Sequence, residues 1–360
     1  MEAIFAYVGC FSTEKRRAHG DGIHVYRVDP KTGACTHVQH VGGLINPSWL
    51  TLNPSQTALY SAHADHDYVT AFSIDRETGH LTLLNTGKAG GRNGVRTMVD
   101  RSERFLAIAN HQSGNIAILP INPDGSVCDC VQAIDMPGSP RHLHRSHDQE
   151  SSRPHDSVFD PSGQFIIFPD KGLDRLFVFG FDPDTGRLTP ADVPFTRTRN
   201  AAGPRHITFH PRRPLAWVVN ELDSTIATYR WDANSGTLTA LDVALTLPGD
   251  FTGDSWTAEI AFLPSSQTIY ISNRGHDSIT IFRVNKRTGF PRPTAWVPTG
   301  GKQPRSFAIE PTGKFLYAAN QSSDSIVAFH IDPQNGSLRP TGQIIPNASP
   351  TTIIFSGGRN

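Results

Sequence analysis

Residues 303–340 read QPRSFAIEPTGKFLYAANQSSDSIVAFHIDPQNGSLRP and form one copy of a repeat that runs through the chain. Related copies are RPHDSVFDPSGQFIIFPDKGLDRLFVFGFDPDTGRLTP at 153–190, GPRHITFHPRRPLAWVVNELDSTIATYRWDANSGTLTA at 203–240 and a further stretch at 46–85. Each copy holds short runs of β-branched and aromatic residues, and turns that begin with Asp or Asn and end near Gly separate these runs. A period of roughly 40–50 residues with four such runs is typical of the blades of a β-propeller.

The number of blades follows from two prolines that lie seven residues apart in the clearest copies, such as Pro304 and Pro311. Six copies begin near residues 47, 94, 154, 204, 257 and 304, and the seventh is split between the two ends of the chain. Its first strand is expected at 349–355, and its other strands at 4–9, 22–30 and 35–41. We therefore predict an all-β protein, a seven-bladed β-propeller whose N- and C-terminal strands close one blade, with residues 1–360 in a single domain.

The composition narrows the classes of function. Of 360 residues, 37% are hydrophobic, which allows a large core, and the formal net charge is +0. A balanced charge argues against nucleic acid or a membrane surface as a partner, and no apolar run approaches the length of a membrane span. The first residues, Met-Glu-Ala-Ile, lack the basic and apolar regions of a secretion signal. Of the four cysteines, only one pair forms a motif, C-x-C, and this motif is a poor metal site. We therefore expect the cysteines to be reduced thiols and the protein to be cytoplasmic.

Two series of equivalent positions are expected to meet at one mouth of the central channel. The residue after each leading proline opens the innermost strand of its blade, and the second strand ends at the rim where the first begins. The inner-strand series is Ser48, Val95, His155, Arg205, Ala258, Arg305 and Thr351. The second-strand series is Ala64, His111, Lys171, Glu221, Arg274 and Gln321.

Four of these positions carry groups that packing alone does not require. Inner strands pack against one another, so small or apolar side chains would suffice, yet three consecutive blades supply His155, Arg205, Glu221 and Arg274. A guanidinium group binds carboxylate or phosphate, and His and Glu transfer protons. We predict that these four residues are catalytic. The alternative is that Glu221 only neutralises an arginine in a structural ion pair.

Other rim residues are candidates for substrate binding, namely Arg305, Lys171, His111 and Gln321. Alternatively, Arg305 and Lys171 are solvated charges at the rim that bind no substrate. Asparagines precede several members of the second-strand series, and we expect them to satisfy backbone groups at the strand ends. These are Asn110, Asn220, Asn273 and Asn320.

A His-rich insertion, DMPGSPRHLHRSHDQESSR at 135–153, lengthens one connection between blades. It carries His142, His144 and His147, so a metal site is one interpretation. Their spacing matches no strong metal signature and arginines are interleaved, so we predict no metal site. Because the insertion joins an outer strand to the next inner strand, we expect it to border the rim as a lid.

The combination of motifs resembles the seven-bladed lactonase family, which includes bacterial 6-phosphogluconolactonases and the fungal carboxy-cis,cis-muconate cyclase. The resemblance covers essentially the whole chain and implies the same four active-site residues that the blade geometry selects. One departure is Arg153, where many relatives have histidine. The motifs are YVGCFS (7–12), RPHDSVFDPSG (153–163), GPRHITFHP (203–211), VNELDSTI (219–226), SNRGHDSI (272–279) and QPRSFAIEPTG (303–313).

The expected function is hydrolysis of an anionic, sugar-type lactone to the hydroxy acid, as in a 6-phosphogluconolactonase. Arg205 and Arg274 would hold the acid group or the developing oxyanion. His155 and Glu221 would share water activation and protonation of the leaving alkoxide, in an order that the sequence leaves open. No cofactor is expected, because no phosphate-binding Gly loop lies between a strand and a helix. The alternatives are a cycloisomerase acting on a muconate-type dicarboxylate and a non-catalytic binding propeller.

Overall fold

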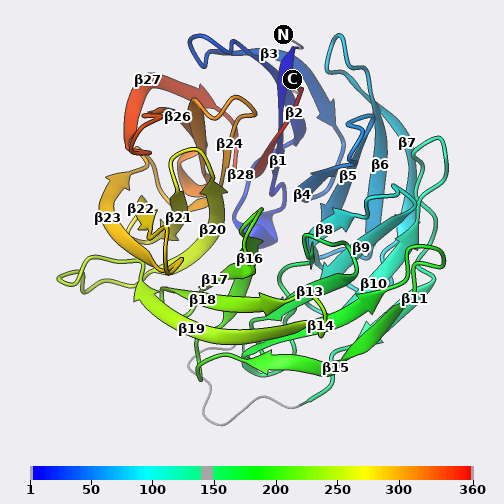
Figure 1. The fold of residues 1–360 in the computed structure, drawn as a ribbon. Helices are drawn as coiled ribbons and strands as arrows, with labels where there is room; N and C mark the ends of the chain where they lie inside the picture. Colours follow the sequence, from blue (N-terminus) through cyan, green and yellow to red (C-terminus); the bar gives the residue numbers. More distant parts are fainter. Residues whose placement is uncertain (1–2, 139–148, 358–360) are drawn as a thin grey trace.

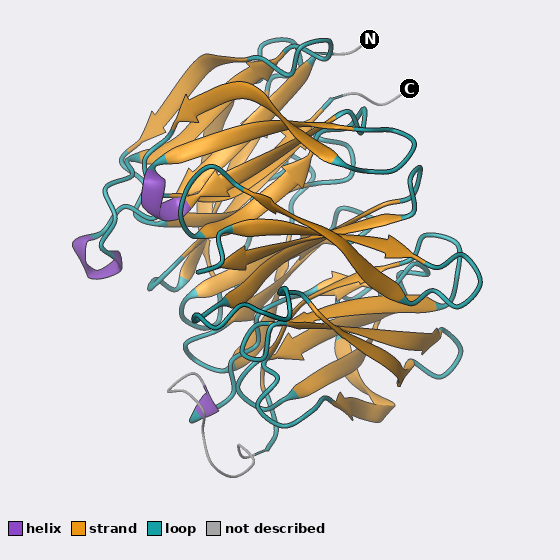
Figure 2. Ribbon diagram, turned by 90° about the vertical axis from the view of Figure 1, so that its left-hand side faces the viewer, coloured by secondary structure: helices purple, strands orange, loops and turns teal. Residues whose placement is uncertain are grey.

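The computed structural model describes residues 3–138 and 149–357, which form seven four-stranded antiparallel sheets around a central channel (Figure 1). Turned by 90°, the turns and loops gather on two opposite faces of the ring (Figure 2). In these described residues, helical structure is limited to short 3-10 turns such as η1 (Glu14–Arg16) and η3 (Gln321–Ser323). No helix in the described ranges is long and apolar enough to cross a membrane. The predicted all-β, seven-bladed architecture is confirmed.

Each sheet is one blade, and its strands follow one another from the channel outward. Three blades contain β4 (Pro47–Leu52), β5 (Ala58–His63), β6 (Tyr68–Ile74) and β7 (Leu81–Lys88); β8 (Gly94–Val99), β9 (Phe105–Asn110), β10 (Asn115–Pro120) and β11 (Gln132–Asp135); and β12 (Val158–Phe159), β13 (Phe165–Asp170), β14 (Arg175–Phe181) and β15 (Leu188–Arg197). Three more contain β16 (Pro204–Phe209), β17 (Leu215–Asn220), β18 (Thr225–Asp232) and β19 (Thr237–Leu245); β20 (Trp256–Leu263), β21 (Thr268–Arg274), β22 (Ser278–Val284) and β23 (Pro291–Pro298); and β24 (Pro304–Ile309), β25 (Phe315–Asn320), β26 (Ser325–Ile331) and β27 (Leu338–Pro346).

The remaining blade is built from both ends of the chain, as predicted. Its strand order is β28 (Pro350–Ser356), β1 (Ile4–Cys10), β2 (Gly22–Val28) and β3 (Cys35–Gly42). β28 and β1 pair antiparallel, with Tyr7 opposite Ile354, and the two strands lie side by side in Figure 1. The pairing leaves no open sheet edge where the ring closes.

Apolar residues between neighbouring blades hold the ring together. One buried cluster joins Tyr317 of β25 to Ala6 of β1 and Ile353 of β28, so it spans the closing junction. The turns between third and fourth strands interlock the blades further. Gly33 has a φ of +72°, and a Cβ atom there would lie 2.6 Å from the ring of Phe315 in the neighbouring blade. Only glycine combines this backbone conformation with so close an approach.

Six of the seven blades show a register shift near the start of the inner strand, which marks a β-bulge. In β16, for example, Pro204 pairs with Asn220 and His206 with Val219, so that Arg205 has no partner in the ladder. The same holds for Ser48, Val95, Arg305 and Thr351. A bulge leaves its extra residue outside the ladder and redirects the side chain, here toward the channel. The repeat therefore fixes where each blade presents one variable side chain.

Candidate active site

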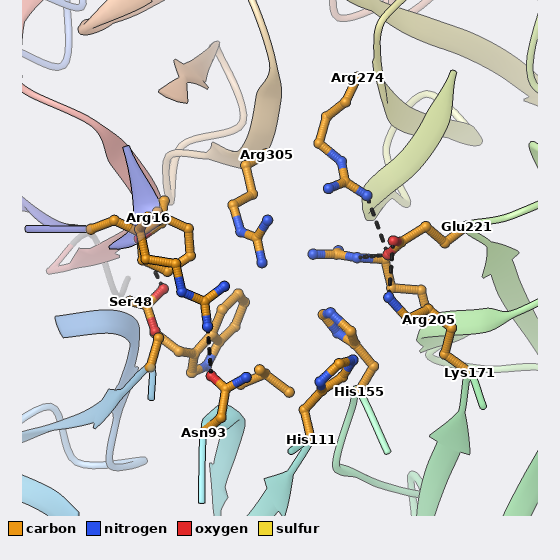
Figure 3. A pocket seen from close by; sticks show the side chains of 15 residues that line it. Arg16, Ser48, Asn93, His111, His155, Lys171, Arg205, Glu221, Arg274 and Arg305 are labelled. Atoms are coloured by element: carbon orange, nitrogen blue, oxygen red, sulfur yellow. Dashed lines mark hydrogen bonds and ion pairs between the residues drawn. The ribbon is translucent and has the colours of Figure 1, made fainter. Parts of the chain in front are cut away.

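The bulged residues surround a cavity of about 210 Å³ at one mouth of the channel (Figure 3). Six of the seven inner-strand positions line it, all but Ala258, and so do most of the second-strand positions. Seven predicted site residues come together there, namely His155, Arg205, Glu221, Arg274, Arg305, Lys171 and His111. Gln321 is absent from the lining because it begins the 3-10 helix η3. The full lining is Phe11, Arg16, Ser48, Trp49, Ala64, Asn93, Val95, His111, His155, Lys171, Arg205, Glu221, Arg274, Arg305 and Thr351.

Glu221 sits among three cations at one side of the cavity (Figure 3). Its Oε2 lies 2.8 Å from Nε of Arg205 and 3.2 Å from Nη2 of Arg274, and its Oε1 lies 3.1 Å from Nζ of Lys171. Burial alone would raise the pKa of Glu221, but the charges of Lys171, Arg274 and Arg205 hold it well below its usual range. The side chain is therefore a carboxylate at neutral pH and cannot donate a proton.

Replacing Glu221 with Gln is expected to destabilise the protein, because three cations would lose the carboxylate with which each of them forms an ion pair. Removing one partner of a buried ion pair typically costs about 3–5 kcal/mol. The measurement is the melting temperature of Glu221→Gln beside that of Glu14→Gln, which removes an exposed carboxylate. Equal melting temperatures would show that the ion pairs contribute nothing to stability.

His155 lies at the bottom of the same cavity as a buried, neutral imidazole. It is 4% exposed, and its ring contacts those of His111 and His206 at centroid distances of 5.4 and 5.3 Å. Burial and then the charge of Arg205 hold the pKa of His155 well below its usual range. Nδ1 of His155 has no hydrogen-bond partner among the described residues. This group is therefore an uncharged proton acceptor beside the cations.

Arg305 and Arg16 flank an aromatic ring on the opposite side of the cavity. Their guanidinium carbons lie 5.0 and 4.9 Å from the centre of the Phe11 ring, which is within cation–π range. Arg16 also forms a bidentate ion pair with Asp65, at 2.8 and 3.0 Å. Arg305 points toward the middle of the cavity, and it forms no ion pair with a carboxylate in the described part of the chain. Desolvation and the charges of Arg274 and Arg205 lower the pKa of Arg305, so a bound anion would stabilise its charged form.

The sequence analysis missed several lining residues, and one of them could have been found. Phe11 directly follows β1 and is thus the second-strand position of the split blade. Arg16 lies in the loop between β1 and β2, which the repeat does not constrain. Asn93 has a φ of +59° and accepts a hydrogen bond from the backbone N–H of Asp65.

A second layer of polar residues lies one residue further along the inner strands. Arg96 binds Asp156 at 2.9 Å and reaches across to Glu259 at 3.6 Å, and Glu259 lies 2.9 Å from Nδ1 of His206. The Arg96 guanidinium also stacks 4.0 Å from the Trp49 ring. Burial raises the pKa of Asp156 to about 6. This layer was not predicted, although each member follows a residue of the inner-strand series.

The rim asparagines have the structural role that was expected. They are fully or almost fully buried, and each donates a hydrogen bond from Nδ2 to a backbone or hydroxyl oxygen of its own or a neighbouring segment. The acceptors include the carbonyl of Ala89 for Asn110 and the hydroxyl of Thr225 for Asn220. Their side chains therefore fix the strand ends and do not face the cavity.

The predicted lid lies largely outside the described residues, as do His142, His144 and His147. The described part resumes at Gln149, whose Nε2 donates to the carbonyl of Lys171 at 3.0 Å. Ser152 and Arg153 both bind the carboxylate of Asp170 at the end of β13. Neither residue lines the cavity, so the end of the insertion braces the strand that carries Lys171.

Comparisons with known proteins agree with this architecture. The model of the family described as lactonase, seven-bladed β-propeller, matches residues 5–355. A 6-phosphogluconolactonase of Bacillus subtilis is 31% identical over 311 residues, which cover 86% of each chain. Another, from Formosa agariphila, is 31% identical and covers 84% of this chain and 85% of its own. The solved structure of a periplasmic gluconolactonase of Pseudomonas aeruginosa superposes with a TM-score of 0.90 at 27% identity and covers 99% of both chains.

Proposed function

The chain belongs to the seven-bladed β-propeller lactonase family, and from this premise we propose that it hydrolyses an anionic sugar lactone of the 6-phosphogluconolactone type to the hydroxy acid. One observation carries the choice of an anionic substrate. Five cationic side chains line the cavity, Arg16, Lys171, Arg205, Arg274 and Arg305, against the single carboxylate of Glu221. Arg16 is paired with Asp65 outside the lining, which leaves four cations beside one carboxylate. Such an excess of positive charge favours a ligand that brings negative charge.

His155 is the proposed general base. It takes a proton from a water molecule whose oxygen attacks the lactone carbonyl carbon, and it returns that proton to the ring oxygen as the C–O bond breaks. Its low pKa in the free protein makes it a weak base, but an anionic substrate among the cations would shift that pKa upward. Glu221 is too strongly stabilised as a carboxylate for the role of acid, and it positions the cations around it.

The arginines divide the remaining work in this proposal. Arg205 and Arg274 lie on the side of His155 and Glu221, so they stabilise the oxyanion that forms at the carbonyl oxygen. Arg305 lies opposite and holds the anionic substituent of the sugar, with Arg16 beside it. Lys171 and His111 complete the wall between the two ends of the cavity.

Replacing Arg305 with Ala should raise KM for the phosphorylated lactone by about 10- to 100-fold, because a hydrogen bond to a charged group contributes roughly 1.5–3 kcal/mol. The kcat should change little, since this residue lies away from the reacting carbon. The matched control is Lys302→Ala, which removes an exposed cation two residues after Gly300 at the same end of the blade. If the unphosphorylated lactone loses affinity equally, Arg305 does not contact the phosphate.

The function itself is tested by measuring acid release above the uncatalysed rate from 6-phosphoglucono-lactone, glucono-lactone and a muconolactone. We expect the phosphorylated sugar lactone to give the highest kcat/KM. Turnover of the muconolactone alone would support the cycloisomerase alternative, and no turnover of any lactone would support a non-catalytic propeller. No feature of the cavity favours either alternative over hydrolysis.

We place the protein in the cytoplasm. All four cysteines, Cys10, Cys35, Cys128 and Cys130, are free, and burial raises the pKa of Cys10 to about 11 and of Cys35 to about 12. Unpaired thiols suit a reducing compartment. The partner in this proposal is a small-molecule substrate, with neither nucleic acid nor membrane involved.

A further inference from the structure

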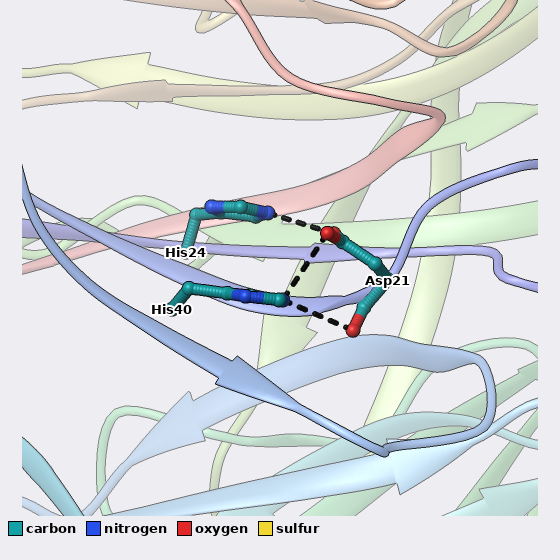
Figure 4. Close-up of side chains that lie close together, drawn as sticks. All are labelled: Asp21, His24 and His40. Atoms are coloured by element: carbon teal, nitrogen blue, oxygen red, sulfur yellow. Dashed lines mark hydrogen bonds and ion pairs between the residues drawn. The ribbon is translucent and has the colours of Figure 1, made fainter.

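A second cluster of chemically active side chains lies on the blade that the two chain ends complete. Asp21, His24 and His40 bring one carboxylate and two imidazole nitrogens within 4.8 Å of one another (Figure 4). Nε2 of His24 lies 2.8 Å from Oδ1 of Asp21, and Nε2 of His40 lies 3.3 Å from Oδ2. None of the three residues lines the cavity, so the lactonase site leaves this cluster unexplained.

The strand register produces this arrangement. His24 of β2 and His40 of β3 are directly opposite each other in an antiparallel pair, so their side chains project from the same face. Their rings are parallel within 9°, with centroids 4.6 Å apart, and both Nε2 atoms point toward Asp21 in Figure 4. Asp21 immediately precedes β2, where the chain enters the strand beside the end of β3. The backbone ladder therefore holds His24 and His40 side by side, and Asp21 lies next to them at the start of β2.

The cluster is electrostatically suited to a cation. The two imidazole rings stack with their centroids 4.6 Å apart and share the single carboxylate of Asp21. A divalent metal ion bound among these atoms would place positive charge beside that carboxylate and would bind the imidazole nitrogens, which are common metal ligands.

We propose that Asp21, His24 and His40 bind one zinc ion. Imidazole nitrogen and carboxylate oxygen are zinc ligands at about 2.0–2.2 Å, and in a tetrahedral complex such atoms lie about 3.3 Å apart. The separation of 3.3 Å between His40 and Asp21 matches that value, the separation of 2.8 Å between His24 and Asp21 is shorter, and all three ligand atoms lie within 4.8 Å of one another. The side chains of Asp21 and His40 are 57% and 38% exposed, so the ion can enter from solvent and water can complete its coordination.

His37 acts as the orienting partner of this site. Its Nε2 lies 3.1 Å from Nδ1 of His24. When a metal ion occupies Nε2 of His24, the ring proton sits on Nδ1 and is donated to His37. Hydrogen bonds of this kind fix the tautomer of a histidine ligand, and their loss weakens metal affinity by roughly 10- to 100-fold.

Zinc titration of chelator-dialysed protein by calorimetry tests the proposal. We expect one zinc ion bound at the cluster and a higher melting temperature with zinc, because binding to the folded state stabilises it. The double variant His24→Gln, His40→Gln should no longer bind this zinc ion. The variant His37→Gln should still bind it, with an affinity about 10- to 100-fold lower. His80→Gln, at an exposed turn of another blade, should bind zinc like the unmodified protein.

A second control separates this cluster from the His-rich insertion. The triple variant His142→Gln, His144→Gln, His147→Gln should retain the zinc equivalent and the zinc-dependent rise in melting temperature. The metal-free melting curve of the His24, His40 variant shows whether it still folds. If that variant folds and binds as much zinc as the unmodified protein, or if the unmodified protein binds none, the proposal is wrong.

Discussion

Replacing His155 with Ala is expected to lower kcat for lactone hydrolysis by about 10²- to 10⁴-fold, the usual cost of losing a general base. The imidazole is buried, uncharged and lacks a partner for Nδ1 in the described structure, so it is available to accept a proton. Its counterparts in sister blades include Ser48, Val95 and Thr351, which shows that small side chains fit this position. The variant should therefore melt like the unmodified protein while losing turnover.

The control for this experiment is His80→Ala, which removes an exposed histidine that does not line the cavity. The pH profile gives a second check. A depressed pKa keeps His155 unprotonated to lower pH, so kcat/KM, which reports the free enzyme, should stay level below the usual histidine pKa of about 6.5. Full activity of the alanine variant, or an acid limb above that pH, would assign the base to another group.

Deleting residues 350–360 is expected to abolish cooperative folding. This deletion removes β28, the innermost strand of its blade, and leaves β1 as an unpaired edge facing the channel. It also removes the buried Ile353 from the cluster that joins the first and last blades, and the hydroxyl of Thr351 that donates to the carbonyl of Ser48 at 3.0 Å. Both the sheet and the packing of the ring depend on this strand.

The measurement is the yield of soluble protein, followed by thermal unfolding monitored by circular dichroism. A protein lacking only residues 358–360 is the matched control and should melt as before. If the longer deletion leaves the protein soluble with an unchanged melting temperature, closure by β28 contributes no stability.

The sequence predicted the fold and most of the cavity because both depend on the repeat. Once the register is known, Arg205 and Glu221 must lie at the same rim, and so must His155 of the preceding blade. The repeat cannot predict the position of residues that lie outside the repeated strands and turns. Arg16 comes from the loop between β1 and β2, and Gln321 begins a 3-10 helix and does not line the cavity.

The charge state of the site could also not be predicted from the sequence. Glu221 was expected either to transfer protons or to form a structural ion pair, and the choice depends on three distances to Lys171, Arg205 and Arg274. The contact from Arg96 across the channel to Glu259 joins residues 163 positions apart, and no local pattern encodes it. Through-space pairs of this kind require coordinates.

The bulge near the start of an inner strand has a consequence for how such a protein can change over evolutionary time. The side chain of a bulged residue takes no part in the backbone ladder, so its replacement alters the mouth of the channel while the blades keep their pairing. Each duplication of a blade thus supplies one independently mutable contact with the ligand. Ser48, Val95 and Thr351 are bulged positions without charge. A library that randomises them is the natural starting point for changing the pocket to accept lactones of different shape.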